Sequence, residues 1–121
     1  VIHIMNYKTG EIVAQKFVTD PLFIFHHINA YESETSNEIV CDVCAYDPNY
    51  FDITRISLDE IFTESLFESN VFKSRACRLR INLNEKDESN KPIHVKLVDI
   101  NSEVAFEMPT INYADKNTLP Y

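Results

Sequence analysis

The stretch from Leu22 to Glu32 constrains the fold of this chain most, because it sets two adjacent histidines inside a long apolar and aromatic run. Its composition favours an extended strand, in which successive side chains point to opposite faces of a sheet. This alternation predicts one face made of Leu22, Ile24, His26, Ile28 and Ala30, and an opposite face made of Phe23, Phe25, His27, Asn29 and Tyr31. His26 and His27 are therefore not expected to serve the same site.

His26 is then expected in an aliphatic row, where a neutral imidazole needs a partner that offsets its desolvation. A metal ion, a buried carboxylate and a backbone carbonyl each meet that need, so His26 is either a satisfied core residue or a metal ligand. Glu107 poses a similar question, because it lies between Phe106 and Met108. It belongs either to an exposed edge or to a site where a carboxylate orients a metal-bound histidine.

Most of the remaining chain alternates with the period of β-strands, and one segment changes to the period of a helix. The run 38–46 is expected to pair with 22–31 as a hairpin that has His26 on its inner strand. Ser57 and Glu60 form a capping box, which predicts one short helix from Leu58 to Glu68. Further strands are predicted over 1–5, 11–18, 76–83, 92–100 and 104–107, with a turn at Asn6–Gly10 that makes residues 1–18 a hairpin.

Charge, glycine content and cysteine count exclude several classes of function. Lys plus Arg number 11 against 19 Asp plus Glu, for a net charge of −8, which argues against nucleic-acid binding. Gly10 is the only glycine, so phosphate-binding glycine loops are excluded. No apolar run is long enough to predict a transmembrane helix. An odd number of cysteines without a secretory signal favours a reduced, intracellular compartment.

Other candidate sites have simpler interpretations. Cys41 and Cys44 have the spacing of zinc and redox motifs, but an offset of three along a strand puts the sulfurs on opposite faces, which favours core thiols. The acidic loop at 85–88 lacks the spacing and the glycine of a calcium loop, so a solvated loop is expected. His3 and His94 are expected to be exposed, and no nucleophile arrangement with a histidine can be assembled.

Two motifs carry a resemblance to a known family. Residues 25–32 read F-H-H-I-N-A-Y-E, which closely resembles a signature of the animal carotenoid oxygenases. Residues 106–113 read F-E-M-P-T-I-N-Y and resemble the family's F-E-[FM]-P-x-I-N-Y segment. Lys8-Thr9-Gly10 and the V-x-D-V-C-x-Y pattern within Glu38–Tyr46 are similar to its flanking strands. The resemblance covers nearly all of residues 1–121 and is weakest across 49–101.

The resemblance implies a mainly β chain that forms about two blades of a seven-bladed β-propeller with one short inserted helix. In that fold a ferrous ion, Fe2+, lies on four histidines, three of them braced by glutamates. By family pattern His26 is an iron ligand and His27 its neighbour on the opposite face. Glu107 is a bracing glutamate whose histidine is not His26 but another one, outside this chain. His3, His27 and His94 do not stand in the contexts of the other three ligands.

For function, the resemblance implies a carotenoid or retinoid substrate and dioxygen, with oxidative cleavage of a polyene double bond. The alternative chemistry in the family is isomerisation coupled to hydrolysis of a retinyl ester. A cytoplasmic enzyme with peripheral membrane association is expected, and residues 1–121 are expected to be an inactive internal fragment of it. A binding module that has lost catalysis and a structural β-domain with a core His26 remain the alternatives.

Overall fold

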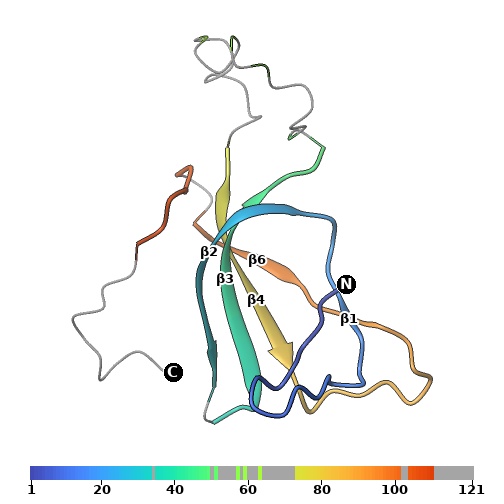
Figure 1. The fold of residues 1–121 in the computed structure, drawn as a ribbon. Coiled ribbons are helices and arrows are strands. Elements are labelled where there is room, and N and C mark those ends of the chain that lie inside the picture. The colour runs from blue at the N-terminus through green and yellow to red at the C-terminus, as the bar shows by residue number, and fades with distance from the viewer. Residues whose placement is uncertain are drawn as a thin grey trace.

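The chain folds into two β-sheets in a computed structural model, which describes residues 1–33, 35–49, 51, 57, 59, 63, 73–101 and 104–110. The larger sheet has the order β2 (Phe23–Glu32), β3 (Glu38–Tyr46), β4 (Arg75–Asn82) and β6 (Leu97–Asn101), and all neighbours are antiparallel (Figure 1). The smaller sheet pairs β1 (Phe17–Val18) with β5 (Ile93–His94) in parallel. The predicted mainly β class is confirmed. The sheets are not closed, which is consistent with part of a propeller; the number of blades, predicted to be about two, stays a prediction.

The central strands begin and end close to where the alternation predicted. β3 has the predicted bounds, and β2 and β4 differ from the predicted runs by one residue at each end. The expected hairpin of residues 1–18 is present as two isolated antiparallel bridges, Ile2–Phe17 and Met5–Ile12. Gly10 has a φ of 73°, the left-handed conformation that glycine adopts without steric cost.

Three other predictions differ from the structure or fall outside it. The run 92–100 is divided between β5 and β6, which belong to different sheets. The run 104–107 is not a strand, because Phe106 N donates to Ser74 O at 3.3 Å and Met108 has a φ of 53°. The helix expected from Leu58 to Glu68 lies outside the described residues, apart from Asp59 and Thr63. No helix occurs in the described part of the chain, and so none there is long and apolar enough to cross a membrane.

One face of the larger sheet is apolar along its whole length, because every second residue of β3 and β4 is hydrophobic. At one end it packs on the smaller sheet in a cluster of Phe17, Leu79, Ile81, Ile93 and Val95, with Ile2, Ile4 and Ile39 around it. At the other end Val43, Ala45 and Cys77 pack with Leu22, Ile24 and Leu97. Each large aliphatic side chain buried in this way stabilises the fold by about 1.5–3 kcal/mol.

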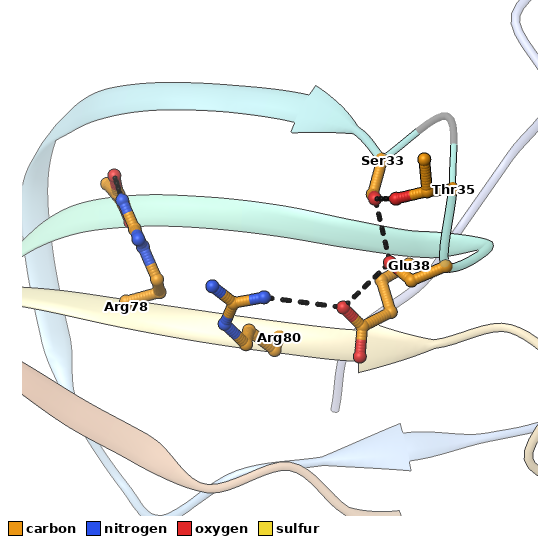
Figure 2. A network of polar contacts seen from close by, with 7 residues as sticks. Ser33, Thr35, Glu38, Arg78 and Arg80 are labelled. Carbon is orange, nitrogen blue, oxygen red and sulfur yellow. Dashed lines mark hydrogen bonds and ion pairs between the residues drawn. The ribbon is translucent and has the colours of Figure 1, made fainter.

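The opposite face of the same sheet changes from polar to apolar along the strands. Asp42 on β3 lies directly opposite Arg78 on β4 and forms a bidentate ion pair with it. Arg80, two residues further along β4, reaches Glu38 at 3.4 Å (Figure 2). Toward the other end of β3 this face is closed, since Cys44 and Tyr46 are 0% and 5% exposed. The candidate site lies at this closed end.

Candidate metal centre

Two irregularities in β2 decide where its histidines lie. Ile24 is aligned with Ala45, but the next aligned pair is His27 with Val43, so Phe25 and His26 together oppose Cys44. A second irregularity between His27 and Asn29 leaves Ile28 without an aligned partner. A β-bulge of this kind inserts one extra residue and redirects the side chains that follow. The first bulge shifts the alternation of β2 by one residue, and the second restores it.

The predicted position of His26 in the row of Leu22 and Ile24 is therefore wrong. Those two residues pack on Val43 and Ala45, whereas the bulge turns His26 to the opposite face, where it meets Glu107. His27 is aligned with Val43 and takes the place in the aliphatic row instead. The two histidines serve different faces, as the alternation predicted. In the described part of the chain β2 is an edge of the sheet, so the expected inner position is also wrong.

His26 is held by a carboxylate that is distant in the sequence. Its Nδ1 lies 2.6 Å from Glu107 Oε2, with the side chains 45% and 25% exposed. The same oxygen accepts a hydrogen bond from Met108 N at 3.0 Å. An ionised carboxylate can only accept, so the proton of a neutral His26 belongs on Nδ1. The lone pair of Nε2 is then available to a metal ion.

The groups around Glu107 favour its ionised form. Burial acts to raise the pKa of this carboxyl, but the Met108 N–H, Tyr46 and His26 outweigh that effect and hold the pKa below its usual value. The second carboxylate oxygen, Oε1, is buried and accepts no hydrogen bond from the described residues. The bonds from His26 and Met108 both reach Oε2.

An aromatic cluster lies beside Glu107, through its member Tyr46. Phe25 lies 4.8 Å from Phe23, 5.6 Å from Tyr46 and 5.5 Å from Phe51, measured between ring centroids and with nearly perpendicular planes. The pKa of Tyr46 is raised to about 12. Burial is the largest cause, and the interaction with the Glu107 carboxylate is the next. Tyr46 is therefore a neutral hydrogen-bond donor in an apolar setting.

One imidazole braced by one carboxylate fits a single position in the coordination shell of a metal ion. Among the described residues no group of three or more His, Cys, Asp or Glu side chains is placed to hold a metal. His94 lies at another site, 3.1 Å from Asp20, and His3 is exposed as predicted. His26 thus has the orientation of a ligand, and the described residues do not complete its site.

The cysteines lie where the strand alternation placed them. Cys41 belongs to the aliphatic face and is half-buried, while Cys44 lies on the opposite face and is buried. Burial is the largest cause that raises the pKa of both thiols. Protonated thiols on opposite faces do not form a common metal or redox site.

The pairing of Glu107 differs from the expectation that the resemblance gave. Glu107 was expected to brace a histidine outside this chain, and the structure pairs it with His26. Tyr46 and Ser74 were not predicted as neighbours of the site. A tyrosine that ends an apolar strand has the pattern of a core residue, and nothing in the sequence distinguishes the two roles.

Comparison with known proteins identifies the family. The family model described as retinal pigment epithelial membrane protein (RPE65) matches residues 1–121. A carotenoid isomerooxygenase of Galleria mellonella is 31% identical over 121 residues, which is 99% of this chain and 22% of that protein. Beta,beta-carotene 15,15'-dioxygenases of Rattus norvegicus and Homo sapiens are each 48% identical over 48 residues, 40% of this chain and 8% of theirs. The chain thus spans about a fifth or less of these relatives, and it belongs to the family of the retinal pigment epithelial membrane protein and the carotenoid oxygenases.

Proposed function

We propose that the full-length protein containing this chain is a non-haem iron(II) oxygenase that cleaves a polyene double bond of a carotenoid or retinoid with dioxygen. One observation carries the proposal: the bond from His26 Nδ1 to Glu107 leaves Nε2 available for a metal ion. The names of the relatives support the substrate class, since they are carotenoid dioxygenases and a carotenoid isomerooxygenase.

In this proposal, bound iron supplies the activation of dioxygen toward the polyene, and the residues of the chain prepare its site. His26 contributes one ligand and fixes the direction of one coordination bond. Glu107 keeps the proton on Nδ1 and increases the basicity of the ring. The cluster of Phe23, Phe25, Tyr46 and Phe51 excludes water from one side, so that charges near the ion are less screened.

Isomerisation coupled to cleavage or to hydrolysis of a retinyl ester is the second candidate. The relative that aligns over 99% of the chain is named a carotenoid isomerooxygenase. Product analysis by reverse-phase chromatography separates the two, because isomerisation gives a cis product and simple cleavage retains the geometry of the substrate.

The proposal extends to the isolated chain and to the location of the enzyme. With one oriented ligand, residues 1–121 alone are expected to be inactive and to bind iron weakly. A tight one-to-one iron complex of the isolated chain refutes this. Because carotenoids are apolar, the full-length enzyme is proposed to be cytoplasmic with peripheral membrane association, and co-sedimentation with phospholipid vesicles tests that part.

Substitution of the two adjacent histidines tests the proposed function. In the full-length protein His26→Ala is expected to lose most of the bound iron and the cleavage of β-carotene, whereas His27→Ala keeps both, since His27 lies on the other face. Glu107→Gln keeps the shape but loses the charge, and is expected to reduce iron affinity by about 10–100-fold. If His26→Ala and His27→Ala retain the same iron content, His26 is a structural residue and the proposal fails.

A further inference from the structure

Two buried hydroxyl groups lie beside Glu107 at the closed end of the larger sheet. Tyr46, the last residue of β3, is 5% exposed, and Ser74, directly before β4, is 1% exposed. Ala45 and Arg75 are the last aligned pair of β3 and β4. Tyr46 and Ser74 are the next residues beyond this pair, one at the end of each strand. Neither hydroxyl belongs to the pair formed by His26 and Glu107.

Ser74 attaches the backbone that carries Glu107. Its Oγ donates a hydrogen bond to Phe106 O, and Phe106 N donates to Ser74 O at 3.3 Å. Both backbone groups of the residue before Glu107 are thus bonded to one serine. The segment 104–107 is not part of a sheet, and these two bonds join its backbone to the residue that precedes β4. Ser74 therefore sets the position at which Glu107 enters the site.

Tyr46 is a buried neighbour of the Glu107 carboxylate. Glu107 Oε2 accepts from His26 and Met108, while the buried Oε1 has no partner among the described residues. Tyr46 interacts with the same carboxylate and also with Ser74. Its ring is held by Phe25 at 5.6 Å and by Phe51 at 4.8 Å, which leaves the hydroxyl as its adjustable part. A buried acceptor without a donor is costly, and the Tyr46 hydroxyl is a neutral donor beside this carboxylate.

We propose that Ser74 and Tyr46 are positioning residues of the metal centre, which fix Glu107 so that its carboxylate holds His26 in the metal-binding orientation. Ser74 fixes the backbone and Tyr46 donates to Oε1. This inference rests on the proposed function, because it assigns both hydroxyls to the same site. Neither residue touches the metal or the substrate in this scheme. Each acts through Glu107.

The loss of one hydroxyl has a consequence that can be measured. Without the Tyr46 hydroxyl, the carboxylate loses this neighbouring donor and is freer to rotate away from Nδ1, so that the His26 ring is less well oriented. Direct bracing groups contribute about 10–100-fold to metal affinity. A residue such as Tyr46, which acts on His26 only through Glu107, is expected to contribute less to metal affinity, about 3–10-fold.

Tyr46→Phe in the full-length protein tests the role of the hydroxyl while keeping the aromatic packing. Tyr31→Phe is the matched control, since it removes the same group from β2 at a position aligned with Val40, away from Glu107. The readouts are iron(II) affinity by chelator competition and the electron paramagnetic resonance spectrum of the iron–nitrosyl adduct. Tyr46→Phe is expected to weaken iron binding about 3–10-fold and to alter the spectrum, and Tyr31→Phe to change neither.

A double substitution separates positioning from general stability. If Tyr46 acts through Glu107, Tyr46→Phe has no further effect on iron affinity in a Glu107→Gln background. An equal loss in both backgrounds, or wild-type affinity and spectrum in Tyr46→Phe, overturns the inference.

Ser74→Ala is expected to weaken iron binding in the same way, and Ser74→Thr, which keeps a hydroxyl, is expected to restore part of it. If Ser74→Ala fails to fold, the decision rests on Tyr46. Retention of iron by His26→Ala is a different failure, that of the proposed function.

Discussion

The ion pair between Asp42 and Arg78 is expected to be the strongest polar contact in the larger sheet. Arg78 Nε lies 2.7 Å from Asp42 Oδ1 and Nη2 lies 2.7 Å from Oδ2, a bidentate arrangement between directly opposed residues of β3 and β4. The hydrogen bond to Asp42 is the largest cause that raises the pKa of Arg78 above its usual value. The perturbation is Arg78→Met, which keeps most of the apolar stem and removes the charge.

Burial sets the size of the expected effect. The Asp42 side chain is 10% exposed, so Arg78→Met leaves a carboxylate nearly buried without its partner. Breaking a fully buried pair costs about 3–5 kcal/mol. Because the Arg78 side chain is 32% exposed and water screens part of the interaction, we expect about 2–3 kcal/mol instead.

A second ion pair of the same chemistry provides the control. Arg75 Nη1 lies 3.0 Å and 2.8 Å from the two carboxylate oxygens of Asp99, but these side chains are 39% and 36% exposed. An exposed pair contributes about 0–1 kcal/mol. Arg75→Met is therefore expected to destabilise the sheet much less than Arg78→Met.

Hydrogen exchange of the full-length protein, followed by mass spectrometry on peptides from β3 and β4, measures the free energy of local opening. Double-mutant cycles with Asp42→Asn and Asp99→Asn isolate the coupling of each pair. If the two pairs show the same coupling, burial does not determine the strength of these contacts and the argument is refuted. At 1 M salt, where the screening length is about 3 Å, only the exposed pair is expected to weaken clearly.

Two further predictions concern single positions. Gly10→Ala is expected to destabilise the N-terminal hairpin by about 1 kcal/mol through strain at its φ of 73°, and without a clash, since nothing lies within 4 Å of the position that the added methyl group takes. Faster hydrogen exchange around Gly10 checks this, and unchanged exchange contradicts it. The pKa of the Cys77 thiol is raised from 9.0 to about 12, and burial is the largest cause, followed by the hydrogen bond to Asp99. Because the folded-state value is the higher one, the stability that the neutral thiol contributes is complete below pH 9 and is lost as the pH rises toward 12. Between pH 9 and 12 the free energy of unfolding, measured with urea, is therefore expected to fall less in Cys77→Ala than in the unmodified protein. Equal losses in the two proteins contradict the attribution of this pH dependence to Cys77.

The sequence predicted the central strands well because their side chains alternate between a buried and a less buried face. β3 and β4 pair in regular register over their whole length, and from Arg78 to Asn82 burial also follows the period of two. The bulges of β2 were not predictable in the same way. A bulge depends on how a strand aligns with its partner, and no glycine in β2 marks one.

The error at 104–107 has a different physical cause. Three apolar residues followed by Glu107, two positions before Pro109, have the pattern of a short edge strand. The backbone hydrogen bonds of this run go to Ser74 and not to a neighbouring strand, which cannot be read from the run itself. The positive φ of Met108, directly before Pro109, ends any extended conformation there.

The two bulges explain how β2 presents a polar group without losing its apolar face. A neutral imidazole in an apolar row needs a partner, and chemistry alone named a metal ion, a carboxylate or a carbonyl for His26 and a histidine for Glu107. These two requirements meet in one contact between residues 81 positions apart. In a regular strand His26 would point into the aliphatic row beside Ile24, and Glu107 would face no ring. The first bulge moves His26 to the aromatic face, and the second returns Ala30 to its aligned position opposite Cys41. The irregular part of β2 therefore lies between Ile24 and Asn29, around the residue that is proposed to bind the metal.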